Sequence, residues 1–271
     1  ALVPGAGDDD NASFSISGDQ LLSAEVFDYE TKDTYTIRAA TTDDTGLSYE
    51  KAFTITINDL NEPPTNITLS NNTIDEKEVI GTLVGTLASI DPDSSTFTYT
   101  LVPGAGDDDN ASFSLTGDQL LSAEVFDFES KDNYNIRVAT TDNGGLAYEK
   151  AFTITINDIN ETPIDLALSN VDIPENEPAG TLIGTLTTTD PDSGDAHVYT
   201  LAPGVLDNDF FTISGDQLLS NAVFDFDTQD TYTIRVRSTD KGGLFIEEVF
   251  TIQITDQKDL DFSIFVPLFG N

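Results

Sequence analysis

Residues 134–163 read YNIRVATTDNGGLAYEKAFTITINDINETP, and this stretch decides the fold. Apolar and polar residues alternate on both sides of the DNGG turn. Phe152, Ile154 and Ile156 share one face of the second half, and the intervening threonines share the other. A period of two residues marks a half-buried β-strand. The stretch therefore predicts two strands joined by a tight turn and followed by an acidic segment, NDINETP.

Nearly the same stretch occurs earlier in the chain. The 61 residues from Leu2 to Glu62 differ from those of Leu101 to Glu161 at 11 positions, so 50 are identical. The pattern returns, less closely, from Leu201 to about Gln257, with a period of about 99 residues. A unit of this length can bury its own core, and tandem copies make elongated molecules. We predict a partial repeat over 1–60, whole repeats over 61–159 and 160–257, and an apolar tail over 258–271.

The second repeat holds seven short segments rich in Val, Ile, Thr, Tyr and Phe. They are 67–70, 82–89, 97–101, 112–115, 119–126, 134–141 and 147–156. Turn residues separate them, and no segment keeps a helical period. The pattern predicts an all-β fold of tandem seven-stranded antiparallel sandwiches, with aromatic residues such as Phe126 and Tyr134 in the core.

The composition excludes several classes of function. The chain has 49 acidic and 11 basic residues, a net charge of −38, no cysteine and one histidine. Such a charge opposes binding to nucleic acid or to an anionic membrane surface. No run approaches the roughly 20 apolar residues that span a bilayer, so we expect no membrane insertion. There is no nucleophile elbow, P-loop or histidine-based metal motif, and we predict that the chain is not an enzyme.

Short acidic motifs recur at fixed places in each repeat. They are IDEK (74–77) and IPEN (173–176); DPD (91–93 and 190–192); DYE (28–30), DFE (127–129) and DFD (225–227); a lone aspartate, Asp43, Asp142 or Asp240; and the joins NDLNE (58–62) and NDINE (157–161). Carboxylates that gather in space repel one another and need cations, and few basic residues lie near these motifs. Oxygen ligands without His or Cys favour Ca²⁺. The alternative is a solvated acidic surface, as in a protein from a salty habitat.

The order PEN, DPD, DFE, ATTDNGG and IND-x-NE-x-P resembles the cadherin repeat in its bacterial cadherin-like form. This resemblance covers residues 1 to about 257. It implies Greek-key sandwiches arranged end to end, with Ca²⁺ ions in each junction and ligands from both neighbours and the join. For the first junction it implies Asp28, Glu30, Asp59, Asn61, Glu62, Asp91, Asp93 and Asp142 as ligands. For the second it implies Glu76, Asp127, Glu129, Asp158, Asn160, Glu161, Asp190, Asp192 and Asp240.

The sequence departs from the family pattern in two places. The joins carry Glu62-Pro63 and Glu161-Thr162 where the family usually has Asp followed by Asn, so we expect an altered number or arrangement of ions. The end of the third repeat has Lys258 where a ligand Asn would be. We therefore expect a weak or empty half-site there, made of Glu175, Asp225, Asp227 and Asp256.

Other polar features are expected to have no special role. The runs Asp8-Asp9-Asp10 and Asp107-Asp108-Asp109 are interpreted as solvated loops, and His197 as a solvated side chain. The sequons at Asn11, Asn66, Asn71 and Asn110 matter only in a host that glycosylates.

The predicted function is a calcium-rigidified structural or adhesive segment of an extracellular or cell-surface protein. Its expected partners are neighbouring repeats, other copies of the chain, and a cell-surface protein or glycan. The first repeat begins without its opening strands, so we expect an excerpt or processed product of a longer protein. One alternative is a filament subunit in which residues 261–271 add a strand to the first repeat of the next chain. Another is a carbohydrate-binding module, which the absence of Trp disfavours.

Overall fold

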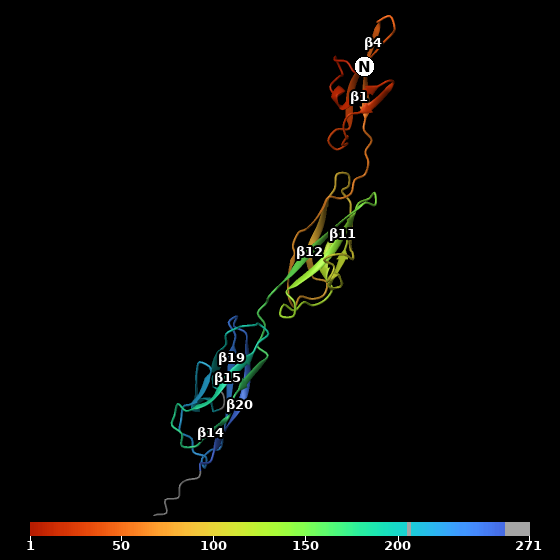
Figure 1. Ribbon diagram of the computed structural model, residues 1–271. Helices are drawn as coiled ribbons and strands as arrows, with labels where there is room; N and C mark the ends of the chain where they lie inside the picture. Colours follow the sequence, from red (N-terminus) through yellow and green to blue (C-terminus); the bar gives the residue numbers. More distant parts are fainter. Residues whose placement is uncertain (205–206, 258–271) are drawn as a thin grey trace, which may run out of the picture. The chain divides into compact units, whose positions relative to one another are not determined.

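The computed structural model describes residues 1–204 and 207–257 (Figure 1). The predicted apolar tail, and the strand donation that depends on it, lie outside the described residues. The described chain divides into two compact units. One contains Ala1–Phe126 and Asn133–Ile156; the other contains Asp127–Asp132 and the described residues from Asn157 onward.

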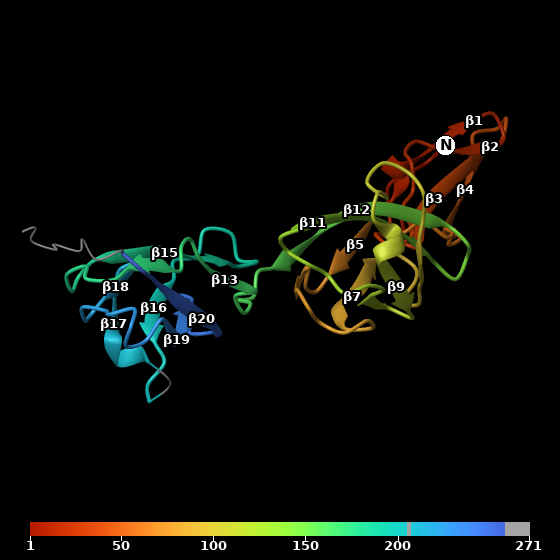
Figure 2. The same cartoon turned by 90° about the horizontal axis from the view of Figure 1, so that it is seen from below.

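The second repeat is a two-layer β-sandwich, most of which belongs to the first unit. Its elements are β5 (Asn66–Leu69), β6 (Thr73–Asp75), β7 (Leu83–Ile90), β8 (Thr98–Leu101), the 3₁₀ turn η2 (Asn110–Ser112), β9 (Phe113–Thr116), β10 (Gln119–Ser122), β11 (Asn133–Thr141) and β12 (Ala147–Asn157). One sheet has the order β5-β7-β10-β9 and the other β6-β12-β11-β8. Strands β11 and β12 form a hairpin (Figure 2), paired from Asn133↔Thr155 to Thr141↔Ala147.

The alternation predicted for these strands is present in their burial. Tyr134, Ile136 and Val138 of β11 are buried, and Asn135 and Arg137 between them are partly exposed; the alternation ends at Ala139 and Thr140, which are both buried. The ring of Phe126 lies 4.8 Å from that of Tyr134 and 5.3 Å from that of Phe113, between centroids. These contacts place the aromatic residues in the core, as predicted, where packed rings stabilise the fold beyond their buried area.

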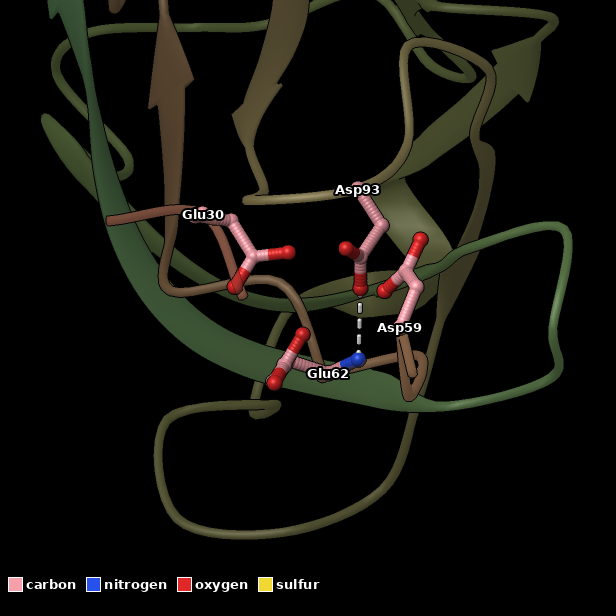
Figure 3. A group of neighbouring side chains, drawn as sticks. All are labelled: Glu30, Asp59, Glu62 and Asp93. Atoms are coloured by element: carbon pink, nitrogen blue, oxygen red, sulfur yellow. Dashed lines mark hydrogen bonds between the residues drawn. The ribbon is translucent and has the colours of Figure 1, made fainter. Parts of the chain in front are cut away.

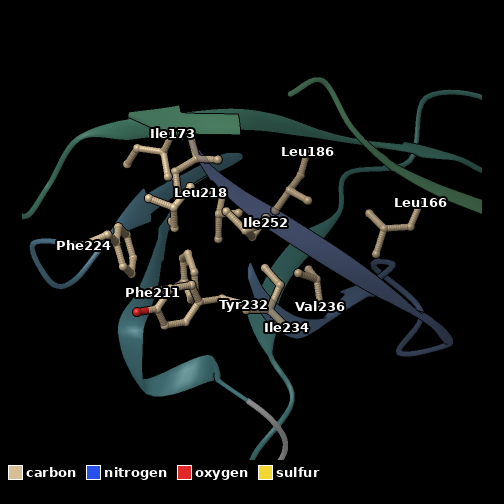
Figure 4. Close-up of a cluster of buried hydrophobic side chains, with 12 residues drawn as sticks. Leu166, Ile173, Leu186, Phe211, Leu218, Phe224, Tyr232, Ile234, Val236 and Ile252 are labelled. Carbon is tan, nitrogen blue, oxygen red and sulfur yellow. The ribbon is translucent and has the colours of Figure 1, made fainter. Parts of the chain in front are cut away.

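The third repeat has the same topology within the second unit. Its elements are β13 (Asp165–Leu168), β14 (Asp172–Pro174), β15 (Leu182–Thr189), β16 (Val198–Leu201), η3 (Asn208–Phe210), β17 (Phe211–Ser214), β18 (Gln217–Ser220), β19 (Thr231–Thr239) and β20 (Phe245–Thr255). The sheets are β13-β15-β18-β17 and β14-β20-β19-β16. Side chains from both sheets fill the space between them (Figure 4), with Phe224, Leu218 and Ile252 almost fully buried.

The first repeat has fewer strands than the other two. Its elements are η1 (Asn11–Ser13), β1 (Phe14–Ser17), β2 (Gln20–Ser23), β3 (Thr34–Thr42) and β4 (Ser48–Thr56), which form the pairs β1-β2 and β3-β4. Leu21 of β2 is 41% exposed, whereas its equivalent Leu120 in the second repeat is fully buried. The uncovered side chains Ile16, Leu21 and Phe53 line a groove of about 580 Å³.

The predicted fold class is confirmed, with two differences in detail. Strand β6 was missed, because three residues are too few to show a period of two. The strand predicted over 119–126 ends at Ser122. The hydroxyl of Ser122 accepts the backbone N–H groups of Gly81 and Thr82, and the chain beyond it carries Phe126 into the core.

The aspartate runs were wrongly interpreted as merely solvated loops. In the second repeat, Asp109 accepts the backbone N–H of Asn135 at 2.8 Å. Asn110 donates to the carbonyl of Val102 and accepts the N–H of Arg137, each at 2.9 Å. In the first repeat the pair Asp10 and Asn11 makes the equivalent bonds to the backbone, and in the third repeat the pair Asp207 and Asn208 makes them. This Asp-Asn pair ties the loop to the central strand, and it engages both ends of the amides in the sequons at Asn11 and Asn110.

Candidate metal centres

The DPD motif forms a tight turn directly after β7. Asp91 Oδ1 accepts the backbone N–H groups of Asp93 at 2.9 Å and Ser94 at 2.8 Å. Such local bonding of an aspartate to the backbone just ahead of it is the usual device of an Asx turn. The turn fixes the backbone of Asp93 and so positions its carboxylate.

The join between the first two repeats is held at two points of the second repeat. The backbone N–H of Glu62 donates to Asp93 Oδ2 at 2.7 Å. The side-chain amide of Asn61 donates to Asp142 Oδ2 at 2.8 Å. Both acceptors are predicted ligands, so the join is anchored to the carboxylates beside which it lies.

Four predicted ligands come together in this first centre. Glu30, from the loop after β2, Asp59 and Glu62, from the join, and Asp93 each offer a carboxylate oxygen, and these atoms lie within 4.8 Å of one another. Figure 3 shows the four side chains around a common space, with the bond from the Glu62 backbone to Asp93. Residues about 30 positions apart in the chain thus converge on one place, and their role as ligands stays a prediction.

The crowding of carboxylates changes their proton affinities. The pKa of the Glu62 carboxyl is raised to about 7. The causes are a hydrogen bond between its side chain and that of Asp93, burial, and the negative charges of Asp93, Glu30 and Asp59. The N–H of Glu62 holds the pKa of Asp93 below its usual range, against the effect of burial. Without a cation, therefore, Glu62 is about half protonated at pH 7 while Asp93 stays ionised.

Two carboxylate oxygens in this region are buried and have no hydrogen-bond partner among the described residues. They are Glu62 Oε2 and Asp91 Oδ2. Buried polar atoms nearly always have a hydrogen-bond partner or a bound ion, so each of these two oxygens is suited to bind one. Carboxylate oxygens with an amide oxygen nearby are the donors that Ca²⁺ prefers, and the residues present fit that ion.

The second unit repeats this geometry with its own residues. Glu129, Asp158 and Asp192 bring carboxylate oxygens within 4.8 Å of one another. The N–H of Glu161 donates to Asp192 Oδ2 at 2.6 Å, and the amide of Asn160 donates to Asp240 Oδ2 at 3.0 Å. The hydrogen bonds that anchor the first join thus have close counterparts in the second.

A further group in the second unit includes residues that sequence reasoning missed. Asp190, Asp195 and Asp240 form a second set of carboxylates within 4.8 Å, and Asp195 Oδ2 is buried without a partner in the described chain. His197 was expected to be solvated, but its side chain is 9% exposed, and its Nε2 donates to Asp190 Oδ2 at 2.8 Å. The signal was available, because the third repeat has one residue more than the second between DPD and the next strand.

The remaining predicted ligands have other contacts. Asp28 accepts the backbone N–H and the hydroxyl of Thr31, and Asp127 accepts the hydroxyl of Ser130. Glu76 is buried in the first unit, 3.6 Å from the ammonium of Lys77. The role of these three in ion binding stays a prediction.

At the expected half-site at the end of the third repeat, some of the predicted carboxylates accept hydrogen bonds from backbone N–H groups. Glu175 accepts the N–H of Phe226 at 3.1 Å and of Gln257 at 2.9 Å. The N–H of Asp227 donates to Asp225 at 3.0 Å. No set of three neighbouring carboxylates that includes these residues is present within 1–204 and 207–257.

Comparison with known proteins finds similarity to cadherins. Residues 169–255 match the model of the cadherin domain. Protocadherin Fat 4 of Mus musculus is 30% identical over 243 residues, which are 82% of this chain and 5% of that protein. Protocadherin gamma-A4 of Pan troglodytes is 28% identical over 278 residues, 94% of this chain and 29% of that protein. Residues 169–255 thus have the sequence pattern of a cadherin domain, and the chain as a whole is similar to protocadherins.

Solved structures agree on the fold. Extracellular cadherin domains 3–6 of protocadherin gamma B2 superimpose with a TM-score of 0.70 at 19% identity, over 96% of this chain and 66% of that one. A cis-dimer structure of protocadherin gammaB7 domains 3–6 gives a TM-score of 0.68 at 20% identity, with the same coverage. The two curated relatives are animal proteins, so the suggested bacterial form of the repeat finds no support in them. Their cadherin identity agrees with the prediction of a non-enzymatic role.

Proposed function

We propose that this chain is a calcium-binding, adhesive segment of a cell-surface protein, in which Ca²⁺ at the joins stiffens the array. The group of Glu30, Asp59, Glu62 and Asp93 carries the proposal. Four carboxylates share one space there, and an oxygen of Glu62 is buried without a partner in the described structure. A divalent cation would neutralise the group and would bind the first repeat, the join and the second repeat together.

Adhesion and cell-surface location rest on the relatives. The chain spans only 5% and 29% of the two curated relatives, so their activities are proposals for this chain. No helix within the described residues is long and apolar enough to cross a bilayer. The gammaB7 protocadherin forms a cis-dimer, which supports other copies of the chain as one class of partner.

Calcium titration of the full chain by calorimetry, with small-angle scattering in calcium and in EDTA, tests the proposal. We expect dissociation constants on the order of 10⁻⁴–10⁻³ M, the range of extracellular modules, and a narrower range of shapes with calcium. Asp93→Asn should weaken the first centre by about tenfold or more. Asp108→Asn, a matched change of an exposed acid in an inter-strand loop, should leave binding unchanged. Absence of binding heat together with identical scattering in both buffers would contradict the proposal.

A second candidate is end-to-end assembly by strand addition, and the groove of the first repeat favours it. Ile16, Leu21 and Phe53 expose apolar surface there. In the second repeat the equivalent of Leu21, Leu120, is fully buried on β10, whose edge pairs with β7. An added strand would cover this surface and pair with the free edge of β2. Deletion of residues 261–271 should abolish fibre formation if those residues are the donor; fibres of unchanged length would exclude them.

A further inference from the structure

The loop between the last two strands of each whole repeat carries a glycine against which the preceding join packs. A Cβ placed on Gly144 would lie 2.5 Å from Cγ and 2.7 Å from Nδ2 of Asn61. A Cβ on Gly242 would lie 2.7 Å from Nδ2 of Asn160. Real Cβ atoms do not approach other heavy atoms so closely. In both places the three nearest heavy atoms belong to the asparagine of the join.

The backbone itself does not require glycine at this position. Gly144 and Gly242 are absent from the residues with positive φ, whereas the glycine that follows each has φ near +90°. The first repeat supplies a natural experiment, because Thr45 occupies the equivalent place there. Its loop still closes with the N–H of Asp43 on the carbonyl of Leu47 at 3.0 Å, as Asp142 does on Leu146. A side chain is therefore compatible with this loop.

The close approach permits one specific bond. Asn61 lies flat on Gly144 while its amide donates to Asp142 Oδ2 at 2.8 Å. Asn160 and Asp240 repeat the arrangement at 3.0 Å. In the first repeat the equivalent aspartate, Asp43, accepts the hydroxyl of Thr45 on its other oxygen, Oδ1, at 2.7 Å. A side chain at this position thus fills the space that the asparagine occupies in the whole repeats.

We propose that the residue two places after the loop aspartate decides whether a repeat accepts an asparagine-bearing join from its preceding neighbour. Gly144 and Gly242 each leave a space, called the seat below, into which the join packs. Asn61 packs against Gly144, and Asn160 packs against Gly242. A repeat with threonine there, as at Thr45, rejects a join of this kind. The contact between Asn61 and Gly144 involves protein atoms alone and does not depend on calcium, although a displaced join would also misplace Glu62.

Hydrogen exchange of the full chain, read by mass spectrometry in calcium and in EDTA, tests the proposal. The join peptide 57–64 is the reporter, and peptide 156–163 of the same molecule is the internal control. Gly144→Thr should speed exchange of the first join about tenfold, the change expected when a hydrogen bond to a charged group is lost, and should leave the second join unchanged. Gly144→Ala should act in the same direction, and it keeps the experiment decisive if the threonine variant folds poorly.

A double-mutant cycle distinguishes loss of the contact between Asn61 and residue 144 from an effect of the substitution on the loop that carries residue 144. In an Asn61→Ala background, Gly144→Thr should have no further effect on the first join, because the clash and the bond are both gone. Equal acceleration in the two backgrounds would overturn the proposal, since the glycine would then serve the loop alone. Unchanged exchange of the join in both buffers for both Gly144 variants would also overturn it. If the wild-type joins exchange identically in calcium and EDTA, the calcium proposal fails, and the cycle still decides the role of Gly144.

Discussion

Binding of calcium to the first centre should displace a proton from Glu62. The pKa of this carboxyl is raised to about 7 by its hydrogen bond with Asp93, by burial and by the charges around it. A metal ligand must be deprotonated, so an ion that uses Glu62 has to expel this proton. The titration of a single group then gives the expected number of protons released: about 0.9 at pH 6, 0.5 at pH 7 and 0.1 at pH 8. The apparent affinity of this centre should rise about tenfold from pH 6 to pH 8.

Calorimetric titration in buffers of different ionisation enthalpy measures the proton number directly. At each pH the observed heat varies linearly with the buffer enthalpy, and the slope is the number of protons exchanged. Glu62→Gln is the matched variant, because it keeps one oxygen ligand and removes the titrating group. We expect this variant to release about 0.5 proton fewer than the wild type at pH 7. A proton number that stays near zero from pH 6 to pH 8 would refute the assignment of Glu62 as a ligand in the crowded group.

Three further outcomes follow from the same structure. Without calcium, the raised pKa of Glu62 means that the folded state binds more protons than the unfolded state between about pH 4.5 and 7, so stability should fall across this window and level off above it, as thermal unfolding in EDTA can measure. Phe126→Ala should cost about 3–5 kcal/mol in urea unfolding, whereas Val125→Ala, at a side chain that is 52% exposed, should change stability by less than about 0.5 kcal/mol. Asn110→Asp sets a carboxylate against the carbonyl of Val102 and should cost about 1–3 kcal/mol, and Asp108→Ala in the same loop should cost almost nothing.

The sequence predicted the fold because the fold depends on short-range patterns that are repeated. Alternation in residues such as Ile154 and Ile156 identified the strands. The resemblance to the cadherin repeat implied Glu30, Asp59, Glu62 and Asp93 as ligands of one junction; the structure brings their carboxylate oxygens within 4.8 Å of one another, and their role in ion binding stays a prediction. A repeated sequence pattern is sufficient for such a prediction, since neighbouring copies of one unit meet through the same surfaces.

What the sequence did not predict depends on single contacts across the fold. The Asp109–Asn110 pair sits in an acidic, glycine-rich loop whose composition is typical of solvated turns. Only the tertiary structure shows its bonds to the central strand β11. Similarly, the short strand β6 and the early end of β10 are set by pairing and by the Ser122 hydroxyl, not by any local pattern.

The two DPD turns show how one inserted residue changes a centre while the surrounding scaffold is kept. In the second repeat Asp91 Oδ2 is buried without a partner in the described chain, so it has an acceptor position to offer a cation. In the third repeat the equivalent oxygen, on Asp190, already accepts a hydrogen bond from His197. A cation that binds this oxygen would share it with the imidazole, and Asp195, in the longer loop of the third repeat, offers a further oxygen without a partner in the described chain. The centres are therefore equivalent in backbone anchoring and different in the donors that reach the ion. It follows that the two centres should bind calcium with different affinities, although the joins that carry them are nearly identical in sequence.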